Sequence, residues 1–184
     1  MLKKLDLSKI DPKYKRDITT QGYRKKQMID GVQIVNLNIM SAPDGYFLEL
    51  GRLIDEGHLE QFPDFKVEQI NLSVIEPGGV KGWHVHYNQE DLWHITVDSM
   101  VLVGLHDLRK DSPTMGMEMK FPMGNHKSQL LFIPRGVAHG VANISIRPAT
   151  MVYLVNQQFD TNDPDEKRLP VDIFGKDFWE MPKG

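Results

Sequence analysis

Apolar and polar residues alternate along much of the chain, which is the pattern of half-buried β-strands. The alternation begins at Gly31–Met40 and continues in Tyr46–Leu50 and Val67–Ile75. Further short runs rich in apolar or β-branched residues predict strands at Val80–His86, Leu92–Val97, Met100–Leu108, Leu130–Ile133 and Ala149–Val155. One stretch, Leu53–Gln61, mixes acidic and apolar residues and predicts a short helix before Pro63.

Glycine- and proline-containing turns separate these strands, at residues 41–45, 77–79 and 112–116. Many short strands with such turns between them predict an all-β sandwich or barrel. Two histidine segments sharpen this prediction: residues 84–90 have the pattern H-x-H-x3-E, and residues 134–143 have the pattern P-x-G-x2-H-x3-N. The pair resembles the two motifs of the cupins, which implies a double-stranded β-helix (jelly-roll) barrel.

The length of 184 residues fits a single cupin-type domain over residues 1–184. We expect an N-terminal arm at 1–30, the barrel at 31–160 and a C-terminal extension at 161–184, with short peripheral helices. Basic residues outnumber acidic ones in residues 1–26. Such a run is typical of a solvated arm, and the alternative is a clamp for an anionic ligand or a neighbouring subunit.

Composition narrows the possible partners. The net charge of −3 offers no basic excess for binding nucleic acid. The chain has no apolar window long enough to span a membrane and no apolar signal core near its start, so we expect a cytoplasmic protein. The absence of cysteine excludes disulfides, thiolate nucleophiles and zinc–thiolate sites.

The histidine segments supply the candidate chemistry. Residues two apart on a strand share a face, so His84 and His86 point together, although periodicity does not decide to which side. Glu90 can turn back toward the open end of the barrel near His84 and His86, and the turn at Pro134–Gly136 can place His139 on the opposite wall of the barrel cavity. Three imidazoles and one carboxylate suit iron, manganese, nickel or zinc. The alternative is a metal-free polar cavity in which these histidines only form hydrogen bonds.

Over roughly residues 30–180, the chain resembles the dTDP-4-dehydrorhamnose 3,5-epimerases of nucleotide-sugar metabolism. The most specific match is His106–Gly116 (HDLRKDSPTMG), which is similar to the family's V-D-L-R-x-x-S-P-T-x-G. Ile133–Gly140 (IPRGVAHG) resembles I-P-E-G-F-A-H-G, and Asp44–Glu49 (DGYFLE) resembles R-G-F-F-x-E. Lys81–His84 (KGWH) takes the place of R-G-L-H.

The resemblance implies a homodimeric, cofactor-free enzyme that removes and returns protons beside the 4-keto group of a dTDP-linked 6-deoxyhexose. It makes His84 the base and Tyr153, in Ala149–Tyr153 (ATMVY), the acid on the opposite face. Its substrate-binding positions correspond here to Phe47, Glu49, Gln69, Asn71, Lys81 and His139. The small-molecule partner is therefore a nucleotide sugar.

The chain departs from the family pattern at four functional positions, one of which is Lys81 in place of the arginine of R-G-L-H. Asp91 stands where the family has a lysine for the enolate oxygen, and Asp44 stands where it has an arginine. The family's C-terminal aspartate, the partner of the base histidine, has no counterpart. We expect Lys81 or His94 to replace the lysine, and Asp107 or Glu90 to orient His84.

Three functions remain open at this point. The first is the nucleotide-sugar epimerase or isomerase that the resemblance implies. The second is a metal-dependent cupin, an oxygenase or isomerase, with a divalent transition metal on His84, His86, Glu90 and His139. The third is a sugar-nucleotide binder without catalytic activity.

Overall fold

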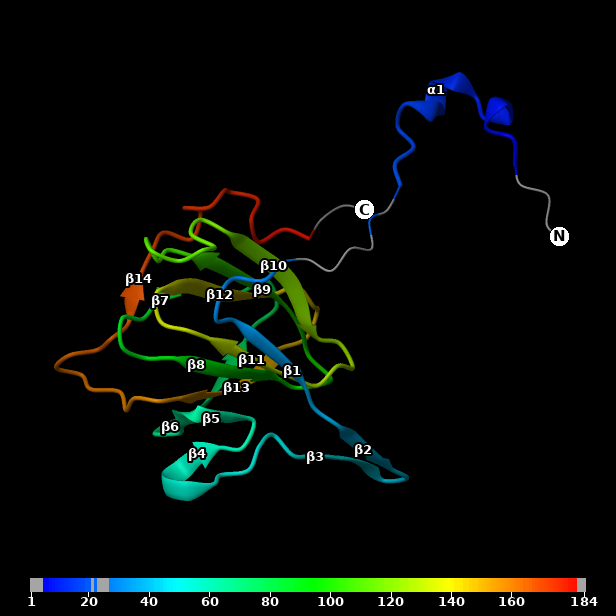
Figure 1. Cartoon of the computed structure of the whole chain (residues 1–184). Coiled ribbons are helices and arrows are strands. Elements are labelled where there is room, and N and C mark those ends of the chain that lie inside the picture. Colours follow the sequence, from blue (N-terminus) through cyan, green and yellow to red (C-terminus); the bar gives the residue numbers. More distant parts are fainter. Residues whose placement is uncertain (1–4, 21, 23–26, 182–184) are drawn as a thin grey trace.

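The computed structural model describes residues 5–20, 22 and 27–181, and its main body consists of two five-stranded antiparallel sheets (Figure 1). The strand order of the first sheet is β1-β11-β8-β13-β6. These strands span Gln33–Asn36, Gln129–Ile133, Asp91–Ile95, Ala149–Val155 and Gln69–Ile75. The strand order of the second sheet is β10-β9-β12-β7-β14. Its strands span Glu118–Gly124, Met100–Asp107, Val137–Asn143, Val80–Val85 and Lys167–Arg168.

The predicted all-β, cupin-type jelly-roll barrel is confirmed by this architecture. Two hairpins accompany the barrel, and both extend from its lower side in Figure 1: β2–β3 (Ile39–Ala42 and Gly45–Leu48) and β4–β5 (His58–Leu59 and Phe62–Lys66). Near the N-terminus lie a 3-10 turn, η1 (Leu7–Lys9), and one helical turn, α1 (Pro12–Lys15). None of the helices in the described ranges has the length and apolar character that a membrane span requires.

The main core lies between the two sheets. Alternate residues of β8 and β9 point into it, including Trp93, Ile95, Val101 and Val103, and Leu131 of β11 joins them. Burying such apolar surface is the dominant favourable term in folding, at about 25 cal/mol per Å². The strand period of two therefore decides which residues of each strand face the interior.

The outer faces of both sheets are partly covered as well. On the first sheet, Phe62 and Phe65 of the β4–β5 hairpin pack against Leu92 and Leu154. On the second sheet, the C-terminal segment covers β7: Trp83, which is fully buried, contacts Phe174, Phe178 and Trp179. Side chains therefore alternate along β7: Trp83 and Val85 point outward under this cover, and His84 points inward.

Some sequence predictions of local structure were wrong. The helix expected at Leu53–Gln61 is instead a 3-10 turn, η2 (Asp55–Gly57), followed by β4. Leu59 and Phe62, which follows the range, lie opposite each other in the β4–β5 hairpin and are both buried, so the segment is held as part of a hairpin. The strand expected at Gly31–Met40 divides into β1 and β2. Strands β10, β12 and β14 were not predicted. The basic segment 1–26 lies in part outside the described residues, at 1–4, 21 and 23–26.

Candidate active site

A cavity of about 540 Å³ opens between the two sheets. The wall formed by β6 is polar because the inward-facing residues of this strand are Gln69, Asn71 and Ser73, while its apolar residues face outward. Most of the residues assigned to the site from sequence line the cavity, namely Gln69, Asn71, Lys81, His84, His139 and Tyr153. His84 and His86 both line it, in keeping with their predicted common face.

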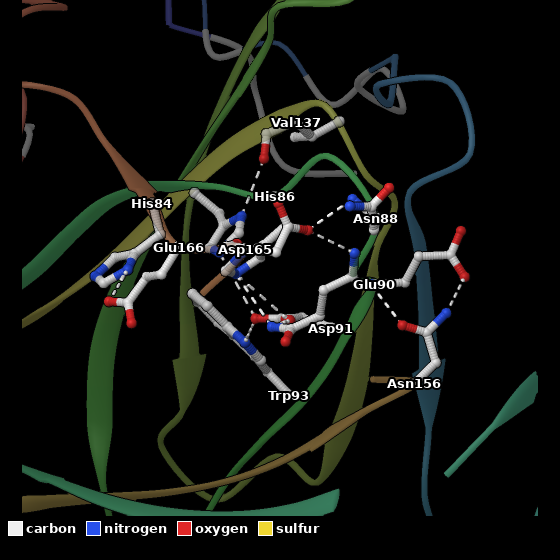
Figure 2. A network of polar contacts seen from close by, with 12 residues as sticks. His84, His86, Asn88, Glu90, Asp91, Trp93, Val137, Asn156, Asp165 and Glu166 are labelled. Atoms are coloured by element: carbon white, nitrogen blue, oxygen red, sulfur yellow. Dashed lines mark hydrogen bonds and ion pairs between the residues drawn. The ribbon is translucent and has the colours of Figure 1, made fainter. Parts of the chain in front are cut away.

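The side chain of His84 is paired with a carboxylate. Its Nδ1 lies 3.0 Å from an Oε atom of Glu166, and Figure 2 shows the two groups facing each other at the edge of the network. Burial lowers the pKa of His84 below its ordinary value, although Glu166 opposes this effect. A neutral imidazole with a carboxylate at one nitrogen can accept a proton at the other, as a general base does.

Burial alone would raise the pKa of Glu166, but the hydrogen bond from Arg168 and the charge of His84 lower it below its ordinary value. Glu166 is therefore ionised at neutral pH. The guanidinium of Arg168 donates to the same Oε1 atom at 2.7 Å, so Glu166 connects a cation to the histidine. The expectation that Asp107 or Glu90 orients His84 was wrong.

Glu166 reaches the cavity because β14 pairs with β7, with Arg168 opposite His84. The preceding residue fixes this segment. The carboxylate of Asp165 accepts hydrogen bonds from the backbone N–H groups of Tyr87, Asn88 and Gln89, at 3.0, 2.6 and 2.9 Å. The chain after β7 and the chain before β14 are thus joined beside the base.

Tyr153 faces the cavity from the other sheet. It lies on β13, where Met151 and Val155 also line the cavity while Leu154 packs on the outer side. Burial, with smaller effects of Asp91 and Glu166, raises the pKa of Tyr153 above its ordinary value. The phenol therefore keeps its proton at neutral pH and can donate it.

A second group of polar side chains lies deeper in the cavity and consists of His86, Asp91 and His139, all buried. Each offers a nitrogen or oxygen atom, and these atoms lie within 4.8 Å of one another. His139 comes from the turn at Pro134–Gly136, where Gly136 has a φ of +78° that favours glycine. Burial lowers the pKa of His139 below its ordinary value, and Asp91 opposes this effect.

Glu90 does not belong to this group, which corrects the ligand set predicted from sequence. Its carboxylate accepts hydrogen bonds from Asn156 at 3.0 Å and from Arg135 at 3.2 Å, on the side of the network away from His84 (Figure 2). The physical reason is the strand period. Asp91 begins β8 pointing inward with Trp93, so the residue before it points outward.

The expectation that His94 replaces the family's lysine was wrong, because His94 faces the opposite side of β8 from Asp91 and Trp93. His94 is buried outside the cavity lining, and its Nδ1 contacts the carbonyl oxygen of Gln129. Lys81 does line the cavity, where its Nζ donates to the Ser73 hydroxyl at 2.7 Å. Asp107 is occupied elsewhere, by hydrogen bonds from Arg109, Ser112 and Thr114.

Two residues assigned to substrate binding lie away from this chain's own cavity. Phe47 is on the β2–β3 hairpin with 59% of its surface exposed, and Glu49 follows the hairpin and pairs with Arg52 at 2.9 Å. Conversely, the cavity includes residues that sequence reasoning missed: Gln89, Asp165, Glu166 and Arg168. Glu166 and Arg168 carried no local signal, because their segment is an ordinary run of mixed charge.

Comparison with known proteins identifies relatives of this chain. Residues 26–172 match the family model described as dTDP-4-dehydrorhamnose 3,5-epimerase. The chain is 40% identical over 145 residues to a spore coat polysaccharide biosynthesis protein, SpsL, of Bacillus subtilis, covering 79% of this chain and 91% of that protein. It is 30% identical over 144 residues to a probable low-salt glycan biosynthesis epimerase, Agl13, of Haloferax volcanii, covering 78% and 89%.

Solved structures share the fold. A dTDP sugar isomerase from Desulfovibrio desulfuricans superposes with a TM-score of 0.70 at 26% identity, covering 84% of this chain and 91% of that one. A 3,5-epimerase from Legionella pneumophila, solved with dTDP-4-keto-L-rhamnose, also gives a TM-score of 0.70, at 22% identity, with 85% and 82% covered.

Proposed function

Because the chain belongs to the dTDP-4-dehydrorhamnose 3,5-epimerase family, we propose that it epimerises a nucleotide sugar by proton transfer beside a ketone. The proposed substrate is a dTDP-linked 4-keto-6-deoxyhexose. The observation that carries the proposal is the pairing of His84 with the Glu166 carboxylate in a cavity that Tyr153 also lines. Burial lowers the pKa of His84 and raises the pKa of Tyr153, which suits the first to accept a proton and the second to donate one.

In this proposal His84 removes the proton from the carbon next to the C4 carbonyl. The C–H bond breaks, its electron pair moves into the enolate, and the imidazole becomes an imidazolium that Glu166 stabilises at 3.0 Å. Tyr153 then donates its proton to the same carbon. Because His84 is on β7 of one sheet and Tyr153 on β13 of the other, the two protons are exchanged on opposite faces of the sugar, which inverts the centre.

The nucleotide diphosphate requires cations and hydrogen-bond donors. Lys81 and Arg168 are the basic side chains in the lining of the described cavity, and the amides of Gln69 and Asn71 lie on the wall formed by β6. A guanidinium and an ammonium suit phosphate oxygens, the first as a fork and the second as a point charge. We assign Lys81 and Arg168 to the diphosphate and Gln69 and Asn71 to the polar groups of the substrate, with His139 in the cavity wall beside them, where it acts on the substrate directly or through a group that it binds.

We further propose that the protein is a homodimer in which Phe47 and Glu49 serve the cavity of a second copy. Three observations support this. Neither residue lies at its own cavity, the β2–β3 hairpin projects from the barrel (Figure 1), and the edge strand β6 exposes a row of apolar side chains, Ile70, Leu72 and Val74. An exposed apolar edge strand is a ready surface for pairing with another chain.

The test is solvent isotope exchange. A panel of 4-keto nucleotide sugars is incubated with the protein in deuterium oxide, and deuterium uptake at C3 and C5 is followed by NMR. We expect uptake with the wild type and a reduction on the order of 10²- to 10⁴-fold in His84→Asn. Binding of these sugars without any exchange would instead indicate a non-catalytic binder. If the protein shows no binding and no exchange, the proposal is contradicted.

A further inference from the structure

We propose that His86, Asp91 and His139 form a binding site for a divalent transition-metal ion in the inner wall of the cavity. The proposal departs from the cofactor-free chemistry that the family resemblance implies. It also differs from the ligand set expected from sequence, because Asp91 takes the place of Glu90 and His84 is engaged by Glu166.

Both imidazoles of the group are oriented by a hydrogen bond at Nδ1. The Nδ1 atom of His139 lies 3.0 Å from the carbonyl oxygen of Val137, and Nδ1 of His86 contacts the carbonyl oxygen of Asp165. A carbonyl only accepts hydrogen bonds, so each Nδ1 carries a proton, and Nε2 is the nitrogen of each ring that can offer a lone pair to an ion. Histidines that bind metals are characteristically oriented in this way, by donating their other N–H to a carbonyl or carboxylate.

The candidate ligand atoms of the three side chains lie close together, within 4.8 Å of one another. Nε2 of His139 lies 3.6 Å from Oδ2 of Asp91, and Nε2 of His86 lies 3.8 Å from Oδ1 of the same carboxylate. Both distances are too long for a hydrogen bond. Ligand atoms placed about 2.0–2.2 Å from an ion are separated from one another by roughly 3–3.5 Å. Small side-chain movements therefore bring all three atoms onto one ion.

The carboxyl group of Asp91 is buried without a lysine or arginine partner in the described part of the chain. The two histidines, which carry a charge only when protonated, lie 3.8 and 3.6 Å from its oxygens. Two neutral donors stabilise its oxygens: Trp93 Nε1 to Oδ2 at 2.9 Å and Gln89 Nε2 to Oδ1 at 2.8 Å. Buried carboxylates are usually paired with a cation or bound to a metal, and this one has the outer donors that a metal ligand needs.

Two histidines and one carboxylate suit Zn²⁺, Fe²⁺, Mn²⁺ or Co²⁺ and leave coordination positions open toward the cavity. Gln89 Nε2 also lies 3.2 Å from Nε2 of His86, and an ion would replace that hydrogen bond while the one to Asp91 remains. A bound divalent ion would supply positive charge next to a substrate oxygen. Because His86, Asp91 and His139 line the same cavity to which the proposed function assigns the substrate, this charge would act in the same reaction.

The experiment measures metal binding directly. Protein purified without a polyhistidine tag is analysed for metals, treated with a chelator, and titrated with Zn²⁺ and with Co²⁺, whose visible absorption reports nitrogen and oxygen ligands. We expect about one ion per chain. We expect the affinity to fall by more than about 100-fold in Asp91→Asn, His86→Gln and His139→Gln, and by a smaller factor in Trp93→Phe, which loses only an outer donor.

The matched controls are His84→Gln and Glu90→Gln, which alter a neighbouring histidine and a neighbouring carboxylate outside the group. Both should keep the ion. Asp91→Asn preserves the shape of the side chain, and circular dichroism of the metal-free variant checks its fold. The proposal is overturned if the wild type takes up no ion, if a correctly folded Asp91→Asn binds as well as the wild type, or if Glu90→Gln loses the ion.

Because binding is measured without substrate, the two proposals fail separately. A protein that binds an ion but catalyses no exchange with 4-keto sugars refutes the proposed function and leaves the metal site in place. A wild-type protein that takes up no ion but catalyses exchange refutes the metal site and leaves the proposed function in place.

Discussion

Nδ1 of His84 and Oε1 of Glu166 lie 3.0 Å apart, although the two residues belong to different strands, β7 and β14. The contact depends on the C-terminal segment folding back along β7, where Asp165 accepts three backbone hydrogen bonds from residues 87–89. A carboxylate from outside the barrel motifs therefore orients the proposed base.

Glu166→Gln tests this relationship. The amide keeps the shape of the side chain but cannot stabilise an imidazolium, so we expect kcat to fall roughly 10- to 10²-fold, less than the loss of the base itself. KM should change little. Glu166→Asp should restore part of kcat. The control Glu90→Gln, whose carboxylate faces away from the cavity, should behave as the wild type, and an unchanged kcat in Glu166→Gln would show that Glu166 has no catalytic influence.

Tyr153→Phe separates proton removal from inversion. Without the phenol, His84 can still remove a proton and return one to the same face, so deuterium uptake should persist while the inverted product falls by about 10²-fold or more. NMR follows both quantities in one sample. Tyr87→Phe, an exposed tyrosine outside the cavity lining, serves as the control. Equal losses of uptake and inversion in Tyr153→Phe would argue against a two-face mechanism.

Leu72→Lys tests the proposed dimer surface. Leu72 has 66% of its surface exposed on β6, between Ile70 and Val74, so a charge there should oppose association through this face. Light scattering coupled to size exclusion should show a shift from dimer to monomer. Ile146→Lys is the matched control, because it places the same charge on an apolar residue that is 93% exposed in a turn. A dimer that survives Leu72→Lys would place the interface elsewhere.

Asp107→Asn tests how the H-D-L-R-x-x-S-P-T segment is stabilised. Burial would raise the pKa of Asp107, but hydrogen bonds from Arg109, Ser112 and Thr114 lower it well below its usual range. We expect the variant to lower the free energy of unfolding at pH 7 by roughly 2–4 kcal/mol, since it leaves a buried network incomplete. Asp98→Asn, at an exposed position, should change it by less than about 0.5 kcal/mol.

The difference in unfolding free energy between wild type and Asp107→Asn should depend on pH. Because the folded-state pKa of Asp107 lies below the unfolded value of about 3.9, the stabilisation is fully present above that value and is lost as the pH falls below it. Urea denaturation should therefore show a smaller difference between wild type and Asp107→Asn at pH 3 than at pH 7. A constant difference across this range would mean that the carboxylate charge is not the source of the stability.

The local sequence determined much of this protein. The period of two predicted β13 with its bounds, Ala149–Val155, and the common face of His84 and His86. Paired histidine motifs indicated the barrel class, and the family motifs indicated the cavity residues of β6, β7, β12 and β13. Such features are visible because a strand's alternation and a turn's glycine are properties of neighbouring residues.

Only the tertiary structure decided the rest. The alternation of side chains along a strand predicts that Glu90 and Asp91 face opposite ways. The packing of β8 between the core and the β4–β5 hairpin decides that Asp91 faces the cavity. The approach of Glu166 to His84 depends on strand pairing between segments far apart in the chain. The residues of Leu53–Gln61 carry mixed signals, and burial of Leu59 and Phe62 against the first sheet outweighs their local preference for a helix.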